Sequence, residues 1–140
     1  MVKENSAAPR RTRRSGGRRG GSSDRHDEIV QLAGELFAER GFLATTIRDI
    51  ADAANVLSGS LYHHFESKES IADELLRAYW DELLGLYEAA AKEDLEPAEK
   101  VRRFVGASIL MLERHRYAVC MLLSDWGYLS SAMPYLQENL

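Results

Sequence analysis

The fold is decided by residues 45–65, whose sequence is TTIRDIADAANVLSGSLYHHF. In the first half of this stretch, Ile47, Ile50, Ala51 and Ala54 recur at i, i+3, i+4 and i+7. Residues at this spacing share one stripe of a helix, so the pattern predicts a short helix with one apolar face.

Polar residues indicate where this helix begins and where the next one follows. The hydroxyl of Thr45 or of Thr46 could cap its start by accepting a backbone N–H of the first turn. Asn55 tolerates a turn conformation, and Ser58 offers the N-cap of a second helix. The sequence therefore predicts two short helices joined by a tight turn.

The second helix is too short and too polar to serve mainly as core. Its apolar residues are Leu61 and Phe65, four apart, and it begins with the small residues Ser58-Gly59-Ser60. Small leading residues let a backbone approach base edges in a major groove about 12 Å wide. A short helix with this pattern is what a DNA-reading helix-turn-helix requires.

Three segments carry a resemblance to a known family: FAERG at 37–41, TTIRDIADAANV at 45–56 and LYHHFESKESI at 61–71. With these spacings, the run from Glu28 to Leu76 resembles the N-terminal DNA-binding domain of the TetR family of bacterial transcriptional regulators. The resemblance implies an all-α protein. A three-helix DNA-binding head with the helix-turn-helix would be linked by a long fourth helix to a helical ligand-binding and dimerisation domain.

The outward residues and the resemblance together predict the DNA contacts. The candidates are Thr46, Arg48, Ser58, Gly59, Ser60, Tyr62, His63, His64 and Lys68. Gly59 has no side chain, so it can only let the backbone come close to the DNA. A cation at Lys68, in the first turn of a helix, opposes the helix dipole, and a DNA phosphate would explain it.

Several of these candidates have structural alternatives. Arg48 could instead form an exposed ion pair with Asp49 or Asp52. Thr46 could act only as a helix cap, and Tyr62 could pack partly into the core.

Charge is distributed unevenly along the chain. Residues 1–25 hold eight Lys or Arg and two acids, a net +6, whereas the remaining 115 residues hold ten and twenty, a net −10. Residues 1–23 are rich in Arg, Gly and Ser, which predicts a disordered segment. We expect a mobile arm that binds DNA phosphates or enters the minor groove, and the alternative is a solubilising tail. Its cations are Arg10, Arg11, Arg13, Arg14, Arg18 and Arg19.

The remaining pattern is helical throughout. We expect a helix over 24–40 with Gly41 after its end, a long fourth helix from the Ser67 cap to Lys92, and a further helix from Pro97 to a break near His115. A bend or loop is predicted across DWGYLSSAMP, residues 125–134, with another helix starting at its Pro.

These elements group into three predicted units: an arm at 1–23, a DNA-binding domain at 24–70 and a regulatory domain at 71–140. An amphipathic pattern still runs at the last residues, YLQENL, so we expect the sequence to be incomplete at its C-terminus.

The periodicity also predicts which side chains are buried in the later helices. On the helix that begins at Pro97, the stripe consists of Val101, Phe104, Val105, Ser108 and Leu112. Cys120 lies in an apolar run and is expected to be a small buried hydrophobe.

The chain shows no motif for catalysis, metal binding or export. Adjacent His63 and His64 diverge by about 100° on a helix and make a poor metal pair, and one cysteine cannot build a zinc site or an intrachain disulfide. No Gly-rich phosphate loop or nucleophile–His–Asp set occurs. We therefore expect a protein that is not an enzyme and needs no cofactor. Because the sequence has no signal peptide and no long apolar run, we also expect it to be cytoplasmic.

The resemblance implies a ligand-responsive regulator, a repressor, whose dimer places two recognition helices in successive major grooves of a near-palindromic operator. A small molecule would then move the fourth helix and release DNA. Candidate pocket residues are Met111, Tyr117, Met121, Trp126 and Tyr128, although Met and aromatic residues at helical spacing are as readily core.

The segments LYHHFESKES and SDWGYL resemble regulators of fatty-acid, steroid or acyl-CoA breakdown, which suggests an acyl-CoA or a lipid or steroid catabolite as inducer. Two alternatives stand beside this hypothesis. One is a constitutive architectural DNA-binding protein of low specificity, and the other is an enzyme or interaction module built on a helical bundle.

Overall fold

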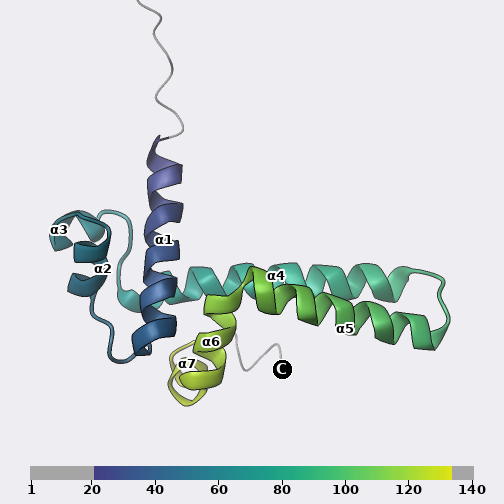
Figure 1. The fold of residues 1–140 in the computed structure, drawn as a ribbon. Coiled ribbons are helices and arrows are strands. Elements are labelled where there is room, and N and C mark those ends of the chain that lie inside the picture. The colour runs from purple at the N-terminus through teal and green to yellow at the C-terminus, as the bar shows by residue number, and fades with distance from the viewer. Residues whose placement is uncertain (1–20, 134–140) are drawn as a thin grey trace, which may run out of the picture.

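A computed structural model describes residues 21–133 of the chain, and helices are the only regular elements of this part (Figure 1). Its elements are α1 (Gly21–Arg40), α2 (Ile47–Ala53), α3 (Ser58–Leu61), α4 (Lys68–Lys92), α5 (Pro97–Arg114), α6 (Arg116–Ser124) and α7 (Trp126–Ala132). The prediction of an all-α fold is confirmed. Between residues 21 and 133, no helix combines the length and apolarity that a membrane span needs.

Helices α1, α2 and α3 share one core, which fixes the geometry of the head. Ile29, Ala33 and Phe37 of α1 are almost completely buried and belong to the same apolar cluster as Ile50 of α2 and Leu61 of α3. Because α3 has only four residues, burial of Leu61 and of Phe65 must hold it in place. Helix α1 begins at Gly21, three residues before the expected start.

Local signals set the ends of α1 and α2 as predicted. Gly41 has φ +87° after the end of α1, and Asn55 has φ +54° in the turn after α2. Both values lie in the left-handed region that Gly and Asn tolerate. Thr46 is the N-cap of α2, whereas Thr45 is buried and its hydroxyl donates to the carbonyl of Gly41 at 2.9 Å.

The expectation for the start of α3 is wrong. Ser58 already has helical backbone, and the N-cap is Leu57, whose side chain makes no capping hydrogen bond. The helix therefore starts one residue earlier than the sequence pattern suggests. After Leu61 the chain continues as a turn to Phe65, which is buried as predicted.

Helix α4 links the head to the remaining helices. It starts at the Ser67 N-cap and runs to Lys92, and α5 then starts at Pro97 and returns along it, as Figure 1 shows. Helix α6 packs against both α1 and α4, and α7 follows after a bend at Asp125. The break predicted near His115 separates α5 from α6.

Helix α7 corrects the prediction of a bend or loop across residues 125–134. Only Asp125 is bent, and Trp126–Ala132 is helical with Leu129 fully buried. Burial of that one leucine outweighs the weak helix propensity of Gly127. The helix predicted from Pro134 lies outside the described residues, as do residues 1–20 of the arm predicted at 1–23, whose last three residues are instead helical.

Two further predictions of burial are wrong. On α5, Val101, Val105 and Leu112 are more than half exposed, because this helix instead turns Phe104, Ser108 and Met111 toward its neighbours. The Ser108 hydroxyl lies 2.6 Å from the hydroxyl of Tyr87 in α4. Cys120 is exposed. The residues that pack from α6 are Ala118 and Met121, which share another side of the helix.

Candidate nucleic-acid interface

The predicted contact residues of α2, of α3 and of the turn after α3 lie at the surface of the head. Arg48, Gly59, Ser60, Tyr62, His63 and His64 are exposed, and Ser58 is half-buried. Tyr62 has 58% of its surface exposed, so core packing does not explain its position. Thr46 is exposed as well, so seven of the nine predicted contact residues are exposed, in α2 with its N-cap, in α3 and in the turn that follows α3.

Arg48 has no ion pair among residues 21–133, so the ion-pair alternative does not hold there. Asp49 is engaged elsewhere: its carboxylate lies 3.6 Å from the Arg40 guanidinium and accepts the N–H of Thr46 at 2.8 Å. The pKa of Asp49 is held below its ordinary value, mainly by the hydrogen bond from the Thr46 hydroxyl. Arg48 thus presents an exposed cation on the outer side of α2, and its charge also helps to lower the pKa of Asp49.

Thr46 is occupied by its capping role. Its hydroxyl accepts the Asp49 N–H at 3.2 Å while its own N–H donates to Asp49 Oδ2 at 2.8 Å, which completes a capping box, and the hydroxyl also donates to Oδ2 at 2.5 Å. The only hydroxyl proton is therefore used inside the protein, and the capping alternative describes Thr46 better than a phosphate contact does.

Lys68 is also held by the protein itself. Its ammonium donates to the carbonyls of Phe42 at 2.8 Å and of Thr45 at 2.9 Å, and it stands 4.3 Å from the centre of the Phe42 ring. These partners explain a cation in the first turn of α4 without an external phosphate. Lys68 ties the start of α4 to the α1–α2 loop.

The start of α1 supports the helix-turn-helix from behind. Arg25 donates to the backbone carbonyl of Ala54 at the end of α2, and it pairs with Glu28 at 2.6 Å. The His26 ring stacks on Phe65 with centroids 4.4 Å apart, and its Nε2 lies 2.7 Å from a Glu74 carboxylate oxygen. Sequence reasoning missed these contacts, because nothing local relates residues 25 and 54.

The five candidate pocket residues do not surround one open space. Met111 and Met121 are fully buried in packing, and Trp126 is at the surface. The hydroxyl of Tyr117 donates to Glu35 at 2.8 Å, and that of Tyr128 donates to Glu69 at 3.2 Å. Their role in ligand binding stays a prediction.

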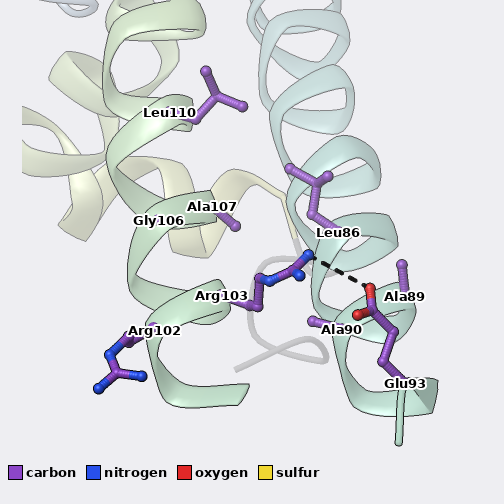
Figure 2. Close-up of a pocket in the computed structure, with 9 residues that line it drawn as sticks. All are labelled: Leu86, Ala89, Ala90, Glu93, Arg102, Arg103, Gly106, Ala107 and Leu110. Carbon is purple, nitrogen blue, oxygen red and sulfur yellow. Dashed lines mark ion pairs between the residues drawn. The ribbon is translucent and has the colours of Figure 1, made fainter. Parts of the chain in front are cut away.

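A hollow of about 310 Å³ does lie between α4 and α5, away from those residues. Figure 2 shows its lining, with Leu86 and Leu110 facing across it and Arg103 paired to Glu93 at 3.7 Å. The complete lining is Leu86, Ala89, Ala90, Glu93, Arg102, Arg103, Gly106, Ala107 and Leu110.

These features are those of a helix-turn-helix DNA-binding protein. A capped α2, a left-handed residue in the turn and a short α3 with small leading residues form a helix-turn-helix on a three-helix head. Helix α4 links that head to a second helical layer, which α4 forms together with α5, α6 and α7.

Comparison with known proteins places the head in a family. Residues 29–75 match the family "Bacterial regulatory proteins, tetR family". The transcriptional repressor KstR2 of Rhodococcus jostii RHA1 is 42% identical over 120 residues, which are 84% of this chain and 59% of that protein. KstR2 of Mycolicibacterium smegmatis is 45% identical over 80% of this chain and 54% of its own length.

Solved structures agree with this placement. The ketosteroid transcriptional regulator KstR2 of Mycobacterium tuberculosis superposes with a TM-score of 0.77 and 41% identity, covering 81% of this chain and 59% of that one. Residues 29–75 are thus a tetR-family domain, and the resemblance found in the sequence is confirmed. The chain spans little more than half the length of the curated relatives it matches.

Proposed function

We propose that the protein is a transcriptional repressor that binds operator DNA through the exposed face of α2 and α3. The observation that carries this proposal is Arg48, an exposed cation without an ion pair in the described residues, next to a recognition stretch at 58–64 that turns outward. Repressors named KstR2 are similar over four-fifths of this chain or more, which supports the same role.

The proposed contacts divide into two kinds. Arg48 and His64 bind phosphates or, for Arg48, a guanine edge, and such contacts position the protein on the duplex. Ser58, Ser60, Tyr62 and His63 face the groove, where base edges carry the sequence information. A homodimer would place two such heads in successive major grooves, about 34 Å apart.

Release by a ligand requires that the second helical layer be coupled to the head. The carboxylate of Asp125 accepts the N–H of Phe42 at 3.1 Å, and the Tyr128 ring lies 5.6 Å from the Phe42 ring. Tyr128 also reaches Glu69 in the first turn of α4. A shift at the α6–α7 corner would therefore move the loop before α2. The inducer must bind the released arrangement more tightly than the DNA-bound one.

The proposed inducer is a lipid or steroid catabolite, in free or acyl-CoA form. A relative of known structure, KstR2 of Mycobacterium tuberculosis, is a ketosteroid transcriptional regulator. The hollow between α4 and α5 is at the small end of the range for ligand pockets, and its apolar walls suit a hydrophobic molecule.

A footprint on the DNA that flanks the protein's own gene tests the proposal. We expect one protected site with two-fold symmetry, abolished in the double variant Arg48→Ala and Tyr62→Ala. Lys92→Ala removes one exposed cation at the far end of α4 and should leave protection intact. Candidate metabolites, added one at a time, should remove the footprint if they are inducers. A double variant that still protects the site would overturn the assignment of the interface.

A further inference from the structure

The start of α3 differs from the other helix starts near it. Helices α2 and α4 begin with complete capping boxes, at Thr46 with Asp49 and at Ser67 with Ser70. Helix α3 begins at Leu57, which cannot cap. An apolar residue at this position forgoes a hydrogen bond that Ser, Thr, Asp or Asn would supply.

Burial does not explain the leucine either. Leu57 has 79% of its surface exposed, more than either of the other large hydrophobic residues that are exposed in the head, Leu43 at 60% and Tyr62 at 58%. Its neighbour Val56 packs against the core cluster, and Leu61 is fully buried. A residue that satisfies neither the helix nor the core is expected where function decides its identity.

The position of Leu57 indicates what that function is. It directly precedes Ser58, Gly59 and Ser60, none of which carries more than a hydroxymethyl group, so its isobutyl side chain extends beyond theirs. The N-terminal residues of a recognition helix are those that meet base edges. In the major groove, the C5-methyl group of thymine is the apolar feature that side chains read.

We propose that Leu57 is a specificity-determining residue that contacts the C5-methyl group of a thymine in each operator half-site. This inference rests on the proposed function, because it needs α3 in a major groove. It assigns an apolar contact to a surface whose other proposed base contacts are made mainly by polar groups.

Selection from a random duplex library tests the inference even though the operator sequence is not known. The unaltered protein should select a site with a thymine that Leu57→Ala and Leu57→Ser no longer prefer, with a loss of roughly tenfold in discrimination at that position. The matched control is Leu43→Ala, which removes an exposed leucine outside α3 and should select the same site as the unaltered protein.

Replacing that thymine by deoxyuridine isolates the methyl group, because base pairing does not change. The unaltered protein should lose roughly fourfold in affinity, as expected for one buried methyl group. Leu57→Ala should bind both duplexes equally. Leu57→Ser restores a capping hydroxyl, so it should unfold at a higher temperature while still losing the thymine preference, which separates recognition from stability.

The outcomes are distinct. Variants that select the same thymine with the same uracil penalty as the unaltered protein would overturn the inference and leave the proposed function standing. A selected site without a thymine that responds to Leu57 would do the same. No selected site for the unaltered protein would instead overturn the proposed function.

Discussion

Thr46 illustrates how one side chain can set the start of the helix-turn-helix. Its hydroxyl both accepts from and donates to Asp49, so the first turn of α2 depends on it. Thr46→Ala should lower the free energy of unfolding by about 1 kcal/mol, measured by urea denaturation. Thr46→Ser keeps the hydroxyl and should behave like the unaltered protein. An alanine variant of unchanged stability would show that the capping box does not contribute.

The same contact predicts a pH effect. The hydrogen bond from Thr46 lowers the pKa of Asp49 from its ordinary 3.8, so the ionised form is favoured in the folded state. The stabilisation is present above the unfolded pKa and is lost as pH falls through the lower folded value, below about 4. In Thr46→Ala, NMR titration of the Asp49 carboxyl should give a pKa closer to 3.8, and the acid loss of stability should shrink.

A close approach between α1 and α6 depends on a glycine. A Cβ added at Gly34 would lie 3.1 Å from the Cβ and Cδ2 atoms of Tyr117 and 3.3 Å from Leu75. The Tyr117 Cβ is fixed to the α6 backbone, so the helices must separate. We expect Gly34→Ala to destabilise by about 1 kcal/mol, because overpacking exceeds the gain in helix propensity.

Gly85 of α4 provides the matched control for this substitution. A Cβ there meets nothing within 4 Å. Gly85→Ala should therefore stabilise the protein by roughly 0.5–1 kcal/mol. Thermal unfolding of the two variants compares them directly, and a shift of the same sign in both would contradict the packing of α6 on α1.

The corner between α6 and α7 holds the loop before α2. Asp125→Ala removes the acceptor of the Phe42 N–H, a hydrogen bond to a charged group that should stabilise by about 1.5 kcal/mol. Hydrogen exchange at the Phe42 amide should become faster, while the control Asp94→Ala, in the α4–α5 connection, should not change it. Equal exchange in Asp125→Ala would show that the corner does not hold the loop.

Local sequence signals predicted the elements well and the contacts between them poorly. Gly41, Ser67 and Pro97 mark ends correctly because capping and turn chemistry involve neighbours in the sequence. The carbonyl partners of Lys68 could not be predicted, because they lie 23 and 26 residues earlier in the sequence. Likewise, the exposed face of α5 depends on how that helix is rotated against α4, which periodicity does not specify.

At the scale of the whole molecule, positive charge is concentrated near the N-terminus. We propose that the cations at residues 10–19 contact phosphates outside the helix-turn-helix site. Deleting residues 1–20 should weaken binding to every duplex alike, and the slope of log affinity against log salt should fall by about 0.9 for each phosphate that the arm neutralises. A changed preference among duplexes with an unchanged slope would contradict a purely electrostatic arm.

The affinity ratio between the footprinted duplex and a scrambled duplex of the same composition, measured at one physiological salt concentration, tests the central claim most directly. For a repressor that reads bases through α3, the ratio should be roughly a thousandfold or more, and Arg48→Ala should lower the affinity for the footprinted duplex. A ratio of about tenfold or less would contradict the account, because sequence-independent phosphate contacts alone would then explain the binding.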